Sequence, residues 1–301
     1  MKLARYAGAR GISVGCVHDG RILDVAHLVG GSLPSIEAIL SEGDAALERI
    51  QAALDRDDAG TPLQEVRLLA PLTRPGKFLG IAHNYQSHLE DVGGGQVPPP
   101  SSDQFWFTKQ ATCITGPNDP IILPLQSVEV DYEAELGIVI GKRCRRVATD
   151  DAISMVAGYL VCNDVSVRDW QRKAPTLGKS FDSHGPIGPW ITTADEVPDP
   201  HNLRLRSWVD GEIRQDSNTK FMINRIEAMI EYLSSVFTLE PGDILSTGTP
   251  AGVGSRMNPP RYLQPGQKVK VHIEGLGYLE NGVAAESADG SSDIRANPGS
   301  T

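Results

Sequence analysis

The chain has 301 residues, of which 40% are hydrophobic and 22% charged, a composition ordinary for a globular protein. Its net charge of -10 argues against a nucleic-acid surface, and no apolar run approaches the roughly 18 residues of a membrane span. The N-terminus lacks the apolar stretch of a secretory signal, and four cysteines without metal-finger spacing are typical of reduced, buried thiols. We therefore expect a cytoplasmic protein that contacts neither nucleic acid nor membrane.

Residues 1–70 predict a small N-terminal α+β domain. Residues 11–17 and 21–28 have the pattern of a hairpin, because Asp19-Gly20 between them supplies the positive φ that a tight turn needs. Three further segments follow in chain order: predicted helices over 35–41 and 44–54, and a polar link over 55–61.

Residues 71–285 predict a larger, β-rich domain, because short apolar runs alternate there with glycine and proline. The runs are 78–82, 112–115, 121–123, 136–140, 155–162, 187–191, 203–209, 243–247 and 269–273. One amphipathic helix is expected over residues 224–237. Residues 93–103 have no hydrophobic pattern, which suits a lid loop, and the polar residues 286–301 suit a disordered tail.

The stretch VDYEAELGIVIGK, residues 130–142, has the alternation of a β-strand but carries three acids on one side. These are Asp131, Glu133 and Glu135, and like charges at adjacent same-side positions repel each other. Converging carboxylates destabilise a fold unless a cation neutralises them. The Glu133 and Glu135 pair therefore suits a metal, whereas the alternative is an exposed acidic edge strand kept soluble by its charge.

Asp164 is the best candidate for a third ligand, because it directly follows the apolar run 155–162 and so lies where a strand ends. A ligand set made only of oxygen selects a hard cation, Mg²⁺ or else Mn²⁺ or Ca²⁺, over zinc. Three protein ligands would leave coordination positions for water and for an α-keto acid.

Six segments, taken together and in order, resemble the fumarylacetoacetate hydrolase family. They are FLGIAHNYQSHLEDV at 78–92, FTKQATCITG at 107–116, VDYEAELGIVIGK at 130–142, GYLVCNDVSVRDWQ at 158–171, GKSFDSHGPIG at 178–188 and LEPGDILSTGTPAGVG at 239–254. The resemblance spans about residues 75–275. It implies an α+β, β-rich fold, with a rolled mixed β-sheet or distorted barrel beside the small N-terminal domain, and a homodimer.

The resemblance also implies divalent-metal chemistry on β-diketo or acylpyruvate-type acids, most often hydrolysis of a carbon–carbon bond. Glu133, Glu135 and Asp164 match the family's metal carboxylates by position. Asp131 matches no ligand position and is interpreted as a bystander.

His88 is the predicted general base, since the unperturbed pKa of histidine lies near neutrality. A carboxylate should orient this base. If the segment is helical, Asp91 at i+3 faces His88 better than Glu90 at i+2, so Asp91 is favoured and Glu90 remains the alternative.

Lys179 matches the family's active-site lysine, which would stabilise a developing enolate, although an ordinary surface lysine is the alternative. Gln171 and Tyr85 match positions of substrate contact in the family's motifs. Arg168 is predicted either to bind the substrate carboxylate or to pair with Asp169 or another acid inside the site.

The glycine-rich residues 246–254 lack both the lysine of a phosphate-binding loop and the spacing of a dinucleotide fingerprint. We interpret them as a bend that presents amide N–H groups and the Thr249 hydroxyl to a substrate anion, or else as a simple tight turn. His83 and His184 stand where relatives often carry other residues, and neither has an assigned role. Gln110 replaces a common proline, which weakens any inference about the preceding Lys109.

These features predict a divalent-metal-dependent hydrolase that cleaves a carbon–carbon bond in a 2,4-dioxo acid, its small-molecule partner. An oxaloacetate decarboxylase or a keto–enol isomerase of a dioxo acid could use the same groups. An alternative of another class is a non-catalytic protein that binds a metal or an acid on the same scaffold.

Overall fold

The structure is a computed structural model that describes residues 1–31, 33–54, 60–93 and 103–287. Its strands are β1 (Lys2–Gly8), β2 (Gly11–His18), β3 (Arg21–Asp24), β4 (Thr61–Pro62), β5 (Arg67–Leu69), β6 (Phe78–Ala82), β7 (Phe105–Thr108), β8 (Ile114–Thr115), β9 (Ile121–Leu123), β10 (Val130–Asp131), β11 (Ala134–Ile140), β12 (Val156–Asn163), β13 (Ser166–Val167), β14 (Gly185–Thr193), β15 (Arg204–Val209), β16 (Glu212–Asn218), β17 (Ile244–Ser246), β18 (Lys268–Ile273) and β19 (Gly277–Ala285). Its α-helices are α1 (Val25–Val29), α2 (Ile36–Glu42), α3 (Asp44–Leu54), α4 (Gln86–Gly93), α5 (Thr149–Ala152), α6 (Arg168–Gln171), α7 (Pro175–Gly178) and α8 (Ile226–Val236).

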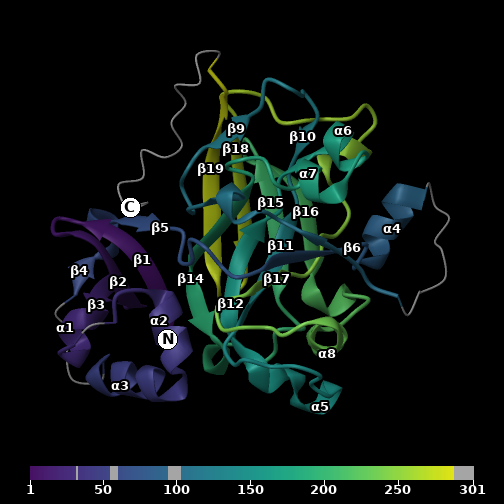
Figure 1. Cartoon of the computed structure of the whole chain (residues 1–301). Coiled ribbons are helices and arrows are strands. Elements are labelled where there is room, and N and C mark those ends of the chain that lie inside the picture. The colour runs from purple at the N-terminus through teal and green to yellow at the C-terminus, as the bar shows by residue number, and fades with distance from the viewer. Residues whose placement is uncertain (32, 55–59, 94–102, 288–301) are drawn as a thin grey trace.

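Two large sheets organise the described residues (Figure 1). The first has twelve strands, with β4-β3-β2-β1-β14-β12-β11-β17-β6-β7 in order and β5 and β8 paired off this path. The second has five strands in the order β16-β15-β18-β19-β9. The main hydrophobic core contains side chains from both sheets, because β11 and β12 pack against β15, β18 and β19. The predicted strand-rich α+β class is confirmed, and neither strand order closes into a barrel within the described part.

The N-terminal strands are continuous with the larger sheet. Strand β1 pairs with β14, with Lys2 opposite Thr192 and Leu3 opposite Ile191. A second core lies between this sheet and the helices α2 and α3, which contribute Ile36, Ile39 and Ile50 among others. The N-terminal segment therefore shares a sheet with the rest of the chain while it covers one face with its own helices (Figure 1).

Most predicted elements are present, but the hairpin is shorter than expected. The second arm ends at Asp24, whose side chain accepts a hydrogen bond from the backbone N–H of His27 and caps α1. The prediction of a strand to residue 28 was therefore wrong, because the capping carboxylate starts a helix there. Strands β1, β4, β5, β7, β13, β16 and β19 were not predicted.

Some expectations fall outside the described residues. These are residues 94–102 of the expected lid, residues 288–301 of the expected tail and residues 55–59 of the polar link. All four cysteines are buried and free of disulfide bonds, as predicted. Within the described chain, no helix has the length and apolar character needed to cross a membrane.

The acidic stretch is two strands rather than one. Strand β10 pairs with β13, whereas β11 pairs with β12 and β17. Between them the backbone leaves the ladder, because the N–H of Glu133 donates to the Asn163 side chain and that of Ala134 to the Gln215 side chain. The break changes which neighbours surround Asp131 and which surround the two glutamates.

Candidate metal centre and active site

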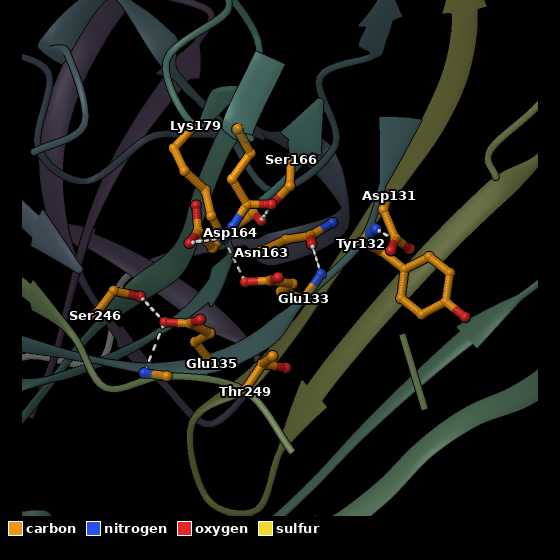
Figure 2. Close-up of polar contacts among 12 residues, drawn as sticks. Asp131, Tyr132, Glu133, Glu135, Asn163, Asp164, Ser166, Lys179, Ser246 and Thr249 are labelled. Carbon is orange, nitrogen blue, oxygen red and sulfur yellow. Dashed lines mark hydrogen bonds and ion pairs between the residues drawn. The ribbon is translucent and has the colours of Figure 1, made fainter. Parts of the chain in front are cut away.

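The carboxylates of Glu133, Glu135 and Asp164 converge where β11 begins and β12 ends (Figure 2). One oxygen from each lies within 4.8 Å of the others, and all three residues are buried. The backbone N–H of Asp164 donates to the carbonyl of Glu133 at 2.9 Å, which ties the two strand ends together. The sequence-based expectation that these acids lie together, and not on an exposed edge, agrees with this placement.

Two buried lysines partly neutralise the cluster. The Lys179 ammonium donates to Glu133 Oε2 at 2.5 Å and to Asp164 Oδ2 at 2.6 Å (Figure 2). The Lys109 ammonium donates to Asp164 Oδ1 at 2.6 Å and to the carbonyls of Lys179 and His184. Lys179 is therefore not a surface lysine. Lys109 also belongs to the site, although no role was predicted for it, because the residue after it is Gln110 where a proline is common.

Glu135 is the least neutralised member of the cluster. Its Oε2 accepts hydrogen bonds from the Ser246 hydroxyl at 2.5 Å and from the Gly248 N–H at 2.9 Å. Burial, followed by the charges of Asp164 and Glu133, raises the pKa of Glu135 well above its usual range. Glu133 differs, because Lys179 and Arg168 outweigh its burial and hold its pKa below the usual range.

The residues present fit a hard divalent cation. With Asp131 included, four buried carboxylates face two ammonium groups and the Arg168 guanidinium, so one negative charge is left over in a buried place. Every candidate ligand atom is an oxygen, which favours Mg²⁺, Mn²⁺ or Ca²⁺ over softer metals. Glu133, Glu135 and Asp164 would hold such an ion.

Arg168 is bonded to acids inside the protein. Its Nε and Nη2 donate to Asp131 Oδ2 at 2.9 and 2.8 Å, and its Nη1 donates to Glu133 Oε1 at 2.6 Å and to Gln171 Oε1 at 2.9 Å. Asp169 instead accepts from the Ser127 hydroxyl. Of the two predicted roles, the structure shows pairing with internal acids, and four of the five guanidinium N–H groups are used within the protein.

His88 lies on α4 with only 9% of its surface exposed, beside the cluster. Burial lowers the pKa of His88 to about 4, so its imidazole is neutral at pH 7 and able to accept a proton. The carboxylate of Asp91 accepts from the Gly252 N–H at 3.2 Å, and Glu90 is exposed. No hydrogen bond joins His88 to either acid among the described groups, and the Asp91 carboxylate is bonded to the glycine-rich loop instead.

A cavity of about 400 Å³ joins these groups. Its wall includes His83, His88, Glu133, Glu135, Arg168, Gln171, Arg172, Lys179, Thr249, Arg256 and Tyr262. Tyr85 is absent from the wall, since its ring is fully buried in the main core. Its predicted contact with substrate has no support in this placement.

The glycine-rich loop, residues 246–254, makes hydrogen bonds to other parts of the protein. The Thr249 hydroxyl donates to the carbonyl of Ala134 at 2.9 Å and accepts from Gln215 Nε2 at 2.7 Å. The Gly248 N–H donates to Glu135. The loop therefore fastens the start of β11 and one acid of the cluster, and Thr249 also lines the cavity. Its predicted presentation to a substrate anion stays a prediction.

The two unassigned histidines have different surroundings. His184 is fully buried outside the cavity wall, and its Nε2–H donates to the Ile122 carbonyl at 2.9 Å. His83 lines the cavity and has a φ of 58°, which is rare for a residue with a side chain. The rings of His83 and His88 lie 6.3 Å apart.

Comparison with known proteins agrees with this site. A family profile described as "Fumarylacetoacetate (FAA) hydrolase C-terminal" matches residues 77–284, which lie inside the predicted domain 71–285. The mitochondrial oxaloacetate tautomerase FAHD2A of Bos taurus is 44% identical over 248 residues, covering 81% of this chain and 78% of that protein. The chain belongs to the fumarylacetoacetate hydrolase family.

Two solved structures illustrate the range of the family. Maleylpyruvate hydrolase from Sphingobium sp. SYK-6, in complex with manganese(II) and pyruvate, has a TM-score of 0.80 and 34% identity, covering 95% of this chain and 99% of that one. The 5-carboxymethyl-2-hydroxymuconate delta-isomerase of Mycobacterium smegmatis has a TM-score of 0.75 and 33% identity, covering 95% and 100%. The three relatives are a tautomerase, a hydrolase and an isomerase, so membership leaves the reaction open.

Proposed function

We propose that this protein is a divalent-metal-dependent enzyme that interconverts the keto and enol forms of a 2-oxo acid of the oxaloacetate type. The observation that carries the proposal is one cavity holding an acid cluster, the neutral base His88 and the cation Lys179. Tautomerisation needs only a base for a carbon-bound proton and positive charge beside the forming enolate. The 44% identity to an oxaloacetate tautomerase supports the same reaction.

The chain's own groups account for the proton transfers. A divalent cation held by Glu133, Glu135 and Asp164 would supply Lewis-acid polarisation of the substrate's keto group. His88 accepts a proton from C3, so that the C3–H bond breaks and the C2–C3 double bond forms. Lys179 places positive charge next to the cluster and so lowers the cost of charge on the C2 oxygen. Return of the proton to that oxygen completes the enol.

Hydrolysis of a 2,4-dioxo acid is the second candidate. The 34% identity and TM-score of 0.80 to a maleylpyruvate hydrolase favour it, and a cavity of about 400 Å³ has room for an acid larger than oxaloacetate. In this reaction His88 takes a proton from water, the water oxygen bonds to C4, and the C3–C4 bond breaks to leave the enolate of pyruvate. The enolate takes the proton back from His88, and the C4 part of the substrate leaves as a carboxylic acid. A carboxylate near His88 would help this step more than tautomerisation, because water must be activated as a nucleophile.

The test compares oxaloacetate with acetylpyruvate and maleylpyruvate, using metal-stripped protein reloaded with Mg²⁺ or Mn²⁺. Enol absorbance reports tautomerisation, and coupled detection of pyruvate reports hydrolysis or decarboxylation. The proposal predicts metal-dependent enol interconversion that falls at least about 100-fold in His88→Gln. His184→Gln is the matched control, because that histidine is buried away from the cavity wall. If neither metal supports any conversion, the non-catalytic scaffold is the better description.

A further inference from the structure

The cavity wall carries one cation that has no carboxylate partner among the described residues. Four cationic side chains line the cavity: Arg168, Arg172, Lys179 and Arg256. Three are paired, Arg168 with Asp131 and Glu133, Lys179 with Glu133 and Asp164, and Arg172 with Glu129 at 2.9 Å. Arg256 is the exception in the part of the chain that the structure describes. A guanidinium in a cavity that receives an acid is a ready partner for a carboxylate.

The backbone that carries Arg256 is firmly held. Arg256 ends a short 3-10 turn, Gly254–Arg256. The N–H groups of Gly254 and Ser255 each donate to the carboxylate of Asp131 at 2.8 Å, and Arg168 holds that carboxylate from the other side. A side chain on Gly254 would meet the Arg261 carbonyl at 2.1 Å, so the turn packs without spare room. Arg256 thus starts from a fixed point on the wall.

His83 lines the same cavity as Arg256, and its loop is also held by hydrogen bonds. The Asn84 side chain donates to the carbonyls of Thr247 and Asn224 at 2.8 and 3.1 Å and accepts from the Asn224 N–H at 2.7 Å. Burial lowers the pKa of His83, and the charge of Arg256 lowers it further. His83 is therefore neutral at pH 7, and Arg256 supplies the positive charge of this part of the wall.

We infer that Arg256 binds a second, distal carboxylate of the substrate and so selects dicarboxylic 2-oxo acids over analogues that end in a methyl group. The inference rests on the proposed function, which places the 2-oxo carboxylate end at the acid cluster. Arg168 and Lys179 are already ion-paired to buried acids, whereas Arg256 breaks no ion pair among the described residues when it binds. The substrate class is therefore a 2-oxo acid with an anionic far end.

The test measures binding by calorimetry to the Mn²⁺-loaded protein, so that it does not depend on turnover. The probes are the diacids 2-oxoglutarate and 2-oxoadipate, each against the monoacid of the same chain length, 2-oxopentanoate and 2-oxohexanoate. Wild type should prefer the better-fitting diacid by about tenfold or more, and Arg256→Gln should reduce that preference to below about threefold. Arg256→Lys should keep part of the preference, because it keeps the charge but loses the planar fork.

Arg172→Gln is the matched control, since it removes the same charge from the same cavity but from an arginine already bonded to Glu129. It should keep the wild-type preference to within about twofold to threefold. The inference is overturned if Arg256→Gln binds diacids and monoacids as wild type does, or if Arg172→Gln loses as much preference. If wild type prefers diacids through Arg256 but converts no oxo acid, the proposed function fails and the inference stands. If it converts them and Arg256→Gln leaves the preference intact, the inference alone fails.

Discussion

Buried acids lie at two neighbouring places near the start of β11. One is the single residue Asp131 and the other is the cluster of Glu133, Glu135 and Asp164, and the two differ in how their charge is balanced. Asp131 receives two bonds from Arg168 and three from backbone N–H groups, those of Tyr132, Gly254 and Ser255. The cluster of Glu133, Glu135 and Asp164 has two lysines for three carboxylates and shares Arg168 with Asp131, and the pKa of Glu135 is raised. The first group is complete without any ligand, whereas the second retains an excess of negative charge.

This difference separates a structural acid from a candidate ligand. A buried carboxylate with all its acceptor positions filled holds the fold together, and Asp131 joins β10, α6 and the 254–256 turn. A buried carboxylate with unbalanced charge lowers stability until a cation arrives. The same substitution of acid by a neutral side chain should therefore have opposite effects in the two groups.

The largest effect is expected at the balanced group. Asp131→Ala leaves the Arg168 guanidinium buried without its main partner and releases the 254–256 turn, so unfolding free energy should fall by about 3–5 kcal/mol. Urea denaturation of metal-free protein measures the change. Asp216→Ala, which removes the partner of Arg204 in an exposed ion pair, should shift the midpoint little. A midpoint equal to that of wild type in Asp131→Ala would contradict the structural role.

The opposite sign is expected at Glu135. Glu135→Gln keeps an oxygen for the Ser246 and Gly248 donors but removes the unbalanced charge, so the metal-free variant should be at least as stable as wild type. Wild type should gain about 2.7 kcal/mol when Mn²⁺ is present at 100 times its Kd, and the variant should gain much less. Activity should fall at least about 100-fold in the variant and in wild type treated with EDTA.

Thermal melts with and without Mn²⁺ measure the first part of this prediction and enol absorbance the second. A metal-free Glu135→Gln that melts well below wild type would show that Glu135 belongs with Asp131 as a structural acid. A full Mn²⁺ stabilisation in the variant would remove Glu135 from the ligand set.

An effect that is absent at neutral pH is expected at His184, which is buried in its neutral form. Burial lowers its pKa from 6.5 to about 4, so below pH 6.5 the unfolded chain binds a proton that the folded chain does not. Stability should therefore fall as pH drops from 6.5 towards 4, by up to about 1.4 kcal/mol per pH unit from this residue. His184→Gln should flatten the slope of the urea midpoint against pH, while the exposed His18→Gln should leave it unchanged. Equal slopes in all three proteins would rule out His184 as a source of acid sensitivity.

Patterns local in sequence were predicted well. The periodicity of residues 35–41, 44–54 and 224–237 corresponds to α2, α3 and α8. The wrong predictions concern places where a side chain hydrogen-bonds to the backbone and interrupts a strand, or where a strand consists mostly of polar residues. Asp24 converts a strand into a helix, the Asn163 and Gln215 side chains interrupt the acidic strand, and the exposed edge strand β16 reads as a polar segment.

For the site, too, features that depend on local sequence patterns were predicted and features that depend on remote contacts were not. The spacing of Glu133 and Glu135 and the strand before Asp164 were enough to predict that three carboxylates meet. Pairing of Arg168 with an acid inside the site was one of two predicted roles, but which acids it meets was not predictable, and neither was the role of Lys109. The acids and carbonyls that these two side chains contact are 35 to 75 positions away in the chain. The choice of Mg²⁺ as the metal, the homodimer and the cytoplasmic location remain predictions.

By itself the sequence determined the family, the strand-rich class and which acids could bind a cation, because these depend on residue types at short, regular spacings. Only the tertiary structure decided which charges are already balanced. Asp131, which the sequence marked as a bystander, fixes the turn that carries Arg256, and Arg168 belongs to the protein rather than to the substrate. Charge balance depends on distance in space and on burial, and both arise only when remote segments pack together.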